Sequence, residues 1–564
     1  MNKKDHSFPY AWIIVCLLFV AACSDTKRPP QKDIAVSPEQ LNKKAIDNIK
    51  TLLDYAEDNK GDIGDSLVLF NDTLVRYSYE KNYYAVLWSY QEQWKPYGDS
   101  LFQFLENARQ FGLFPEDYHY AELSGIRKRF EADTLGQADR RDAALWSRAD
   151  LLLTDAFIRV TKDVKLGRLA KDSITMRTDS VLSNDFYPRQ LNIVKQSGSI
   201  LRAIEPLEPR HKGYQLLKAG LKKFLDSADY RPLTIVPLPS KDSIAVYKRA
   251  LQTRLYEGGF LSNDSVGADS ATIAAAVKKF QKKEHITVDG KAGAGTIRLL
   301  NLSDREKFIR IAITMDRYKM LPDTMPARYV WVNLPSYYMR LVDADSIKMV
   351  SKIICGKSVT RTPVLTSAIY NMVTYPQWTM PVSIIVKEVL PGVKKDTGYF
   401  RKKGYSLIDA AGNEVDPQTV DWKKYHKGIP YKVVQGSGDD NALGVLKFNF
   451  SNKYAVYLHD TNQRYLFAQT IRSLSHGCVR VQEWQKLAYA ILHYDDTDSL
   501  KISVKEDSLN SWLSQKVKRT LPIRNKLPVY IRYFTCEGKD NGIVFYDDMY
   551  GEDKLLREKY FANK

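Results

Sequence analysis

The hydrophobic pattern of the chain changes its period at Arg328. Before this residue, apolar side chains recur at helical spacing, as in residues 41–56 and 305–318. After it, they alternate with polar ones, so residues 329–334 and 338–342 are predicted strands. A chain of 564 residues is too long for one hydrophobic core. We therefore predict a multidomain α+β protein, with a helical N-terminal domain and a mainly-β sandwich toward the C-terminus.

Residues 38–240 are predicted to form a mostly helical domain. A helix is expected to end at Gly112, and a second one continues to Gly167, a glycine suited to a helix C-terminus. Between the helices, the residue types at 66–70 and 74–79 favour short strands. The acidic pairs of this domain are typical of solvated faces, and no catalytic group of residues stands out in it.

Residues 241–302 are predicted to form a compact three-helix unit. Asp269 is expected to cap a helix whose apolar face carries Ile273, Val277 and Phe280. This apolar spacing alone suits any three-helix bundle.

Near the C-terminus, residues 475–480 read Ser-His-Gly-Cys-Val-Arg. A cysteine is a good nucleophile only as a thiolate, and a nearby imidazole can take its proton. Two histidines are available to Cys478: His476, which is close in sequence, and His459, which ends an alternating run. Gly477 gives the chain freedom to turn sharply, and backbone amides at such a turn can face a developing oxyanion. The alternative is a buried, inert thiol beside a core histidine.

The cysteine count bears on that choice. The chain has five cysteines, at positions 16, 23, 355, 478 and 536. Cys16 lies in a predicted signal segment and would be removed with it, and Cys23, at the end of that segment, is expected to carry lipid. Three cysteines, an odd number, then remain in the exported chain. A disulfide framework is therefore not expected, and one free thiol must remain. The run that ends at Cys355 is apolar, so this residue is predicted to lie in the core.

The N-terminus is predicted to be a signal peptide, residues 1–22. Two lysines precede the apolar run 12–22, which is short for a membrane span. The run ends in Val-Ala-Ala-Cys23, which resembles a bacterial lipobox, so cleavage before Cys23 and lipid on its thiol are expected. An ordinary signal peptide and an uncleaved anchor are the alternatives. Residues 23–37 are polar and are predicted to be a tether.

A protein with a formal charge of +18 could bind nucleic acid, anionic lipid or an acidic polymer. No nucleic-acid motif is present and the lysines and arginines are spread widely, so we expect an anionic cell envelope and no nucleic acid. The histidines show no metal-ligand spacing, and neither a metal nor another cofactor is expected.

His459, fifteen intervening residues and then Ser475-His-Gly-Cys478 resemble the signature of the L,D-transpeptidase catalytic domain of bacterial cell-wall enzymes. The resemblance covers residues 327–505, and Arg480 fits an arginine that many members carry. The helical domain is similar to the scaffold domain of larger members. Residues 241–302 are similar to a small peptidoglycan-binding module, which serves in wall binding or as a spacer.

The resemblance implies a peptidoglycan L,D-transpeptidase, a periplasm-facing lipoprotein held on a membrane. His459 takes the proton of Cys478, and the thiolate attacks a donor stem peptide after its third residue. D-Alanine leaves, and an amine of an acceptor stem then makes a 3→3 crosslink. Hydrolysis, as in an L,D-carboxypeptidase, and a wall-binding structural lipoprotein with a silent catalytic domain are the alternatives. A papain-like peptidase has its cysteine before its histidine, the reverse of the order here.

Other residues near the motif have predicted supporting roles. Ser475 and His476 are expected to support the loop, and the backbone amide of Gly477 is expected to face the oxyanion. The alternative for His476 is that it, rather than His459, takes the proton of Cys478. Arg480 is expected either to bind a stem carboxylate or to lock the loop in a salt bridge. Trp378 is predicted to contact substrate. For Tyr457, pocket lining and core packing remain equal alternatives.

Two segments flank or interrupt this domain. Residues 382–440 are long, basic and rich in loop residues, and the resemblance implies a subdomain that covers the site, a lid in our interpretation. Residues 506–564 are predicted to form a C-terminal extension, in which 528–534 and 542–546 pair as a β-hairpin.

Overall fold

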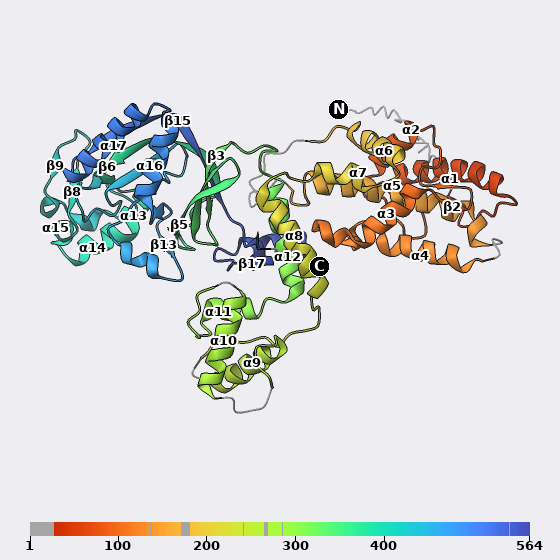
Figure 1. The fold of residues 1–564 in the computed structure, drawn as a ribbon, viewed down its shortest axis with the longest axis horizontal. Helices are drawn as coiled ribbons and strands as arrows, with labels where there is room; N and C mark the ends of the chain where they lie inside the picture. Colours follow the sequence, from red (N-terminus) through yellow and green to blue (C-terminus); the bar gives the residue numbers. More distant parts are fainter. Residues whose placement is uncertain are drawn as a thin grey trace, which may run out of the picture. The chain divides into compact units, whose positions relative to one another are not determined.

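The computed structural model describes residues 28–134, 138–170, 181–240, 242–263, 269–284, 286–540 and 542–564 (Figure 1). The predicted signal peptide, with Cys16, and the predicted lipid site Cys23 lie outside the described residues. The chain divides into two compact units: the first holds residues up to Glu106, 115–161 and 182–205, and the second holds the remainder. Among the described residues, no helix has the length and apolarity needed to cross a membrane.

The first unit is helical. Its elements are α1 (Pro38–Asp58), α2 (Asp72–Glu80), β1 (Ser89–Tyr90), β2 (Gln93–Trp94), α3 (Pro96–Glu106), α4 (Tyr120–Ala132), most of α5 (Ala143–Lys165), α6 (Phe186–Ser197) and α7 (Leu201–Ile204). The strands predicted at 66–70 and 74–79 are wrong, because the second stretch lies in α2. The buried carboxylate of Asp155 accepts hydrogen bonds from the amides of Phe70 and Asn71, which fixes the start of this helix.

The predicted tether is wrong in its second half. The amide of Asp33 donates to Asp142 Oδ1 at 2.9 Å, and the amide of Ala35 donates to the carbonyl of Arg141 at 2.8 Å. Ala35 itself is buried. Residues 33–35 therefore belong to the packed first unit, because their backbone groups are satisfied by it.

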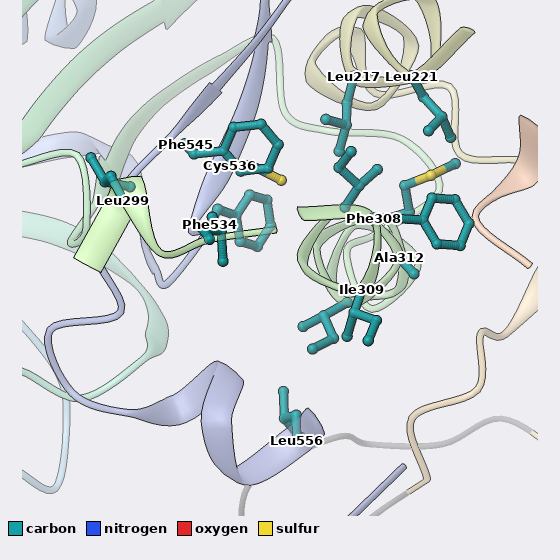
Figure 2. Close-up of a cluster of buried hydrophobic side chains, with 14 of the residues drawn as sticks. Leu217, Leu221, Leu299, Phe308, Ile309, Ala312, Phe534, Cys536, Phe545 and Leu556 are labelled. Atoms are coloured by element: carbon teal, nitrogen blue, oxygen red, sulfur yellow. The ribbon is translucent and has the colours of Figure 1, made fainter. Parts of the chain in front are cut away.

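The predicted boundary between the helical domain and the next domain lies after residue 240, but the second unit already includes the chain from Pro206 onward. Helix α8 (Lys212–Ser227) packs against β16 (Cys536–Lys539) and β17 (Gly542–Phe545). A Cβ at Gly220 would lie 2.6 Å from the carbonyl oxygen of Gly542, so this close approach requires glycine. Figure 2 shows Leu217 and Leu221 of α8 in the same buried cluster as Cys536 and Phe545.

The three helices predicted within residues 241–302 are confirmed as α9 (Ile244–Glu257), α10 (Ser270–Lys283) and α11 (Ala294–Leu300). Asp269 caps α10 by accepting from the amide of Thr272, as predicted. The buried side chain of Gln281 donates to Asp289 Oδ1 and accepts from the amides of Asp289 and Gly290. This network fixes the turn between the last two helices, and α12 (Asp304–Tyr318) follows.

The β-rich part contains one nine-stranded sheet, in the order β13-β5-β14-β12-β11-β6-β15-β3-β4. Its strands are β3 (Arg328–Asn333), β4 (Tyr338–Asp343), β5 (Ser346–Gly356), β6 (Leu365–Thr374), β11 (Leu446–Phe450), β12 (Leu458–His459), β13 (Ser473–Ser475), β14 (Val479–Val481) and β15 (Arg519–Arg532). Because β4 also pairs with β5, the sheet closes on itself, and its layers face each other across a core that contains Cys355. The predicted α+β class, with a mainly-β domain, is confirmed.

The predicted C-terminal extension is wrong in one respect: β15, which follows residue 505, is part of the main sheet. It pairs antiparallel with β6 and parallel with β3. The predicted hairpin is also wrong, because residues 528–532 lie in β15 while β16 and β17 form a separate two-stranded sheet. Helices α16 (Trp484–Asp495), α17 (Ser499–Ser514) and α18 (Glu552–Tyr560) complete this part of the chain.

Residues 382–440 are not the loop-rich segment that the sequence suggested. With β7 (Trp378–Thr379) they form a four-stranded sheet, β7-β10-β8-β9, in which β8 is Tyr405–Ile408, β9 is Glu414–Val415 and β10 is Lys432–Gln435. A helical stretch runs from Val382 through Lys395, and α15 (Tyr399–Lys403) follows. The segment has its own apolar core, to which Leu407, Trp422 and Val433 contribute, and is a folded subdomain.

Candidate active site

The Ser-His-Gly-Cys motif forms the tight turn between β13 and β14. Gly477 has φ of +123°, a left-handed value that disfavours any residue with a Cβ. The hydroxyl of Ser475 donates to the carbonyl of Cys478 at 2.6 Å and accepts from the amide of Gly477 at 3.1 Å. Ser475 therefore holds the turn from inside, and the Gly477 amide, predicted to face an oxyanion, is already engaged.

A loop after β5 supports the other side of this turn. The hydroxyl of Thr362 donates to the carbonyl of Gly477 at 2.8 Å and accepts from the amide of Gly356 at 2.9 Å. The hydroxyl of Tyr550 in turn donates to the carbonyl of Gly356 and accepts from the amide of Thr362. All of these contacts are buried, so the turn is fixed by residues far from it in sequence. The sequence analysis missed both Thr362 and Tyr550.

Cys478 lies immediately before β14, next to Tyr457. The parallel pairing of β12 with β14 places His459 beside Arg480, and the amide of Val479 donates to the carbonyl of Tyr457. The thiol donates to the carbonyl of Ala455, with 3.7 Å between Sγ and oxygen. Burial raises the pKa of this thiol, while hydrogen bonds from Tyr457 act in the opposite direction.

His459 is buried, with 3% of its surface exposed. Burial, and then the charge of Arg480, lower the pKa of its imidazole to about 3, so the ring is neutral at physiological pH. Its Nδ1 is buried and has no hydrogen-bond partner among the described residues. The unpartnered nitrogen leaves the neutral imidazole a position at which to accept a proton, but the burial that keeps the ring neutral also makes it a weaker base, and the thiol of Cys478 bonds to Ala455 in this structure.

His476, the alternative base, has one of its two ring nitrogens engaged. Its Nε2 donates to Glu388 Oε1 at 2.5 Å, and Glu388 belongs to the folded subdomain of residues 382–440. The subdomain thus contacts the Ser-His-Gly-Cys turn through this side chain.

The aromatic residues predicted near the site are brought together. The centroids of the Tyr457 and His459 rings lie 5.7 Å apart, so the two side chains lie on the same face. Burial raises the pKa of the Tyr457 hydroxyl, as does the neighbouring Cys478, whereas the indole of Trp378 acts in the opposite direction. Tyr457 therefore has both the candidate nucleophile and Trp378 as neighbours, which favours pocket lining over simple core packing for this side chain.

Arg480 makes no ion pair within the described part of the chain. Its Nη1 donates to the neutral amide of Gln463 at 2.9 Å, and its Nε is buried without a partner. The salt bridge given above as one alternative for Arg480 is therefore absent from the described contacts.

Lys447, which the sequence analysis missed, also lies here. It is paired with His459 across β11 and β12, and its Nζ lies 3.9 Å from the centroid of the Tyr457 ring. Its place on an alternating strand next to that of His459 was the available signal. No group of three potential metal-ligating side chains occurs among the described residues.

Comparison with known families agrees with the geometry. Residues 327–499 match the L,D-transpeptidase catalytic domain. The chain carries an L,D-transpeptidase catalytic domain. Residues 73–221 match the scaffold domain, and residues 249–300 match a family described as "Putative peptidoglycan binding domain". The match to the L,D-transpeptidase domain ends at residue 499, before β15, although β15 lies within the same sheet.

A curated relative from Haemophilus influenzae, named "Putative L,D-transpeptidase", is 36% identical over 247 residues, which is 44% of this chain. The chain spans about half of that relative, 48% of its length. Two solved structures also align. One is an L,D-transpeptidase from Stackebrandtia nassauensis, at 17% identity over 46% of this chain and 90% of that chain. The other is the Ldtfm-avibactam carbamoyl enzyme, at 11% identity over 50% of this chain and 87% of that chain. Both TM-scores are 0.17.

Proposed function

We propose that the protein is a peptidoglycan L,D-transpeptidase that forms 3→3 crosslinks through a thioester on Cys478. The observation that carries the proposal is the buried, neutral His459 on the same face as Tyr457, which touches the thiol, with its Nδ1 unpartnered. This arrangement supplies a nucleophile and a base that is not already protonated.

In the first half-reaction, His459 takes the thiol proton as Sγ attacks the carbonyl carbon of the third stem residue. The C–N bond to D-alanine then breaks, and the imidazolium returns the proton to the leaving amine. Because Ser475 already engages the Gly477 amide, we assign the oxyanion to the amide of Cys478 and the hydroxyl of Tyr457.

In the second half-reaction, the neutral amine of an acceptor stem attacks the thioester carbonyl. The new C–N bond forms as the C–S bond breaks, and the amine proton passes through His459 to regenerate the thiol. Water in place of the amine gives L,D-carboxypeptidase activity instead.

The test is mass spectrometry of the protein and of the stem peptides after incubation with a tetrapeptide donor. The expected results are an acyl adduct on Cys478, released D-alanine and a 3→3 dimer. Tripeptide without dimer would assign hydrolysis. No adduct and no release of D-alanine would favour the silent structural lipoprotein.

We further propose that the enzyme is a lipoprotein of the cell envelope, with lipid on Cys23, and that residues 241–302 hold it on the wall. A Cys23→Ala variant is expected to lose acylation and to leave the membrane fraction. Deleting residues 241–302 is expected to reduce sedimentation with isolated sacculi. Unchanged sedimentation would make the module a spacer.

A further inference from the structure

The face around Cys478 carries positive charge that the described residues do not neutralise. Lys447 is half-buried, and burial lowers the pKa of its ammonium. The charges that act on it are those of Cys478 and of Lys518, and no carboxylate is among them. Arg480 is in the same situation, since Cys478 and Tyr465 are the groups that act on it.

Lys518, which lies just before β15, completes the group. Its Nζ donates to the neutral amide of Gln377 at 2.9 Å, next to the site residue Trp378. Lys447 and Arg480 thus act on the Cys478 thiol, and Lys518 acts on Lys447. None of these three cationic side chains, from three separate segments, has an acidic partner in the described part of the chain. Lys518 is exposed, but Lys447 and Arg480 are partly withdrawn from water. Lysine and arginine are seldom placed so without an acidic partner, because the desolvated charge is costly.

We propose that Lys447, together with Arg480 and Lys518, forms an anion-binding subsite for a carboxylate of the donor stem peptide. This inference rests on the proposed function. The bound group must lie close to the attacked carbonyl, because the ring of Tyr457 lies 3.9 Å from Lys447 Nζ and also contacts the thiol. An extended chain advances about 3.5 Å per residue, so a carboxylate one residue from the scissile bond is within reach.

Two carboxylates of a donor meet that condition. One is the terminal carboxylate of the leaving D-alanine. The other is a side-chain carboxylate on the third residue, present when that residue is a diamino dicarboxylic acid. Both offer the same chemistry to Lys447.

The experiment compares three donors: the free tetrapeptide, the same peptide with a C-terminal amide, and the same peptide with the third-residue side-chain carboxylate amidated. The measured quantity is kcat/KM for release of D-alanine or its amide. For the wild type, amidating the bound carboxylate is expected to lower kcat/KM by about 10- to 100-fold, as for a lost hydrogen bond between charged groups. The donor that shows the loss identifies the carboxylate.

The deciding variant is Lys447→Gln, with Lys447→Arg as the conservative change. Lys447→Gln is expected to lower kcat/KM for the free donor and to bring the ratio between free and amidated donors close to one. Lys447→Arg is expected to retain most of that ratio. The matched control is Lys453→Gln, an exposed lysine over the ring of Tyr454 on the same hairpin, and it should leave the ratio unchanged.

The ratio separates binding from an effect on the thiol, because a change in nucleophilicity alters the rates with all donors equally. If Lys447→Gln slows all three donors by the same factor, Lys447 acts on Cys478 and the subsite is wrong. If the wild type does not discriminate among the donors, the subsite is likewise wrong although the proposed function stands. If the wild type releases nothing from any donor, the proposed function itself fails.

Discussion

The hydroxyl of Thr362 donates a hydrogen bond of 2.8 Å to the carbonyl of Gly477, the residue before the candidate nucleophile. Thr362 is 1% exposed, and it also satisfies the amide of Gly356. One side chain therefore serves two buried backbone groups, and one of them belongs to the catalytic turn. The contact restrains the turn, because Gly477 has no Cβ and its backbone is otherwise free to adopt many conformations.

Thr362→Val should weaken both the fold and the reaction. The substitution keeps the shape but leaves two buried backbone groups without partners, at a cost of about 1–3 kcal/mol each in unfolding free energy. Urea unfolding and the rate of Cys478 acylation by a carbapenem are the measurements. Thr366→Val is the matched control, since its hydroxyl accepts from Arg532 on the outer surface. An unchanged acylation rate in a destabilised Thr362→Val protein would show that the contact serves the fold alone.

Cys478 and His459 should behave as one catalytic pair. Cys478→Ala should abolish crosslinking, because no neighbouring side chain can form the thioester. His459→Ala should slow acylation by about 10²- to 10⁴-fold, as expected for the loss of a general base. His476→Ala should have a smaller effect, because we assign His476 a supporting role in the loop, through its contact with Glu388, and not the proton transfer. Single-turnover acylation of the three variants is the measurement, and a larger loss in His476→Ala than in His459→Ala would exchange their roles.

The pH dependence of alkylation at Cys478 should follow a thiol with a raised pKa. Burial raises the pKa of Cys478, so the thiolate fraction, and with it the labelling rate by iodoacetamide, should keep increasing above the ordinary thiol pKa of about 8.5. The imidazole of His459, with a pKa of about 3, stays neutral above pH 5 and should add no inflection between pH 5 and 8. An inflection near pH 6.5 that disappears in His459→Ala would instead indicate an imidazolium–thiolate pair at rest.

Cys355 and Cys536 should be dispensable for catalysis. The three described cysteines, including Cys478, form no disulfide with one another. Burial raises the pKa of the Cys355 and Cys536 thiols to about 12, so neither should be alkylated in the native state at neutral pH. Changing both to serine should cost about 1–3 kcal/mol for each buried hydroxyl that lacks a partner, and leave activity measurable. Peptide mapping after native alkylation is the check, and loss of activity in the folded double variant would reveal a role for one of them.

Local sequence signals explain which parts of the fold could be predicted. Helical spacing gave α1, α10 and α12, and alternation gave β3 and β4, because each of these elements buries one regular face. The strands expected at 66–70 and 74–79 failed because a distant carboxylate, Asp155, fixes the start of α2. Propensity is a weak guide where tertiary contacts of this kind decide.

The candidate site divides in the same way. Cys478 and His459 could be predicted because thiol and imidazole are reactive side chains, and because the Ser-His-Gly-Cys motif and its spacing from His459 are recognisable in the sequence. Lys447 and Thr362 are common residue types, and only the pairing of β11 with β12 and the packing of the loop after β5 bring them to the site. The position of Thr362 therefore leaves no local pattern in the sequence, and for Lys447 the alternation of its strand was the one local signal.

Strand β15 is the element whose place in the fold the local sequence pattern predicts least well. Its sequence contains Pro522 and Pro528, which favour an edge strand or none, yet it lies between β6 and β3. The register shifts between Pro522 and Leu527, which places the polar residues Arg524, Asn525 and Lys526 in an irregular stretch. A chain that stops at residue 505 therefore loses an internal strand of the sheet. We expect that protein to be insoluble, because it exposes two unpaired strand edges.

A point variant tests the same idea in the full chain. Val529 is 0% exposed and pairs with both Val330 and Ser367, so Val529→Asp buries an unpaired charge at a cost on the order of 3–5 kcal/mol. Lys526→Asp, at an exposed position in the irregular stretch, is the control and should be nearly neutral. The measurements are solubility, thermal unfolding and labelling of Cys478 by a carbapenem. A soluble 1–505 protein that still labels at Cys478 would show that β15 is an accessory strand, and that the L,D-transpeptidase domain folds within the limits of its family match.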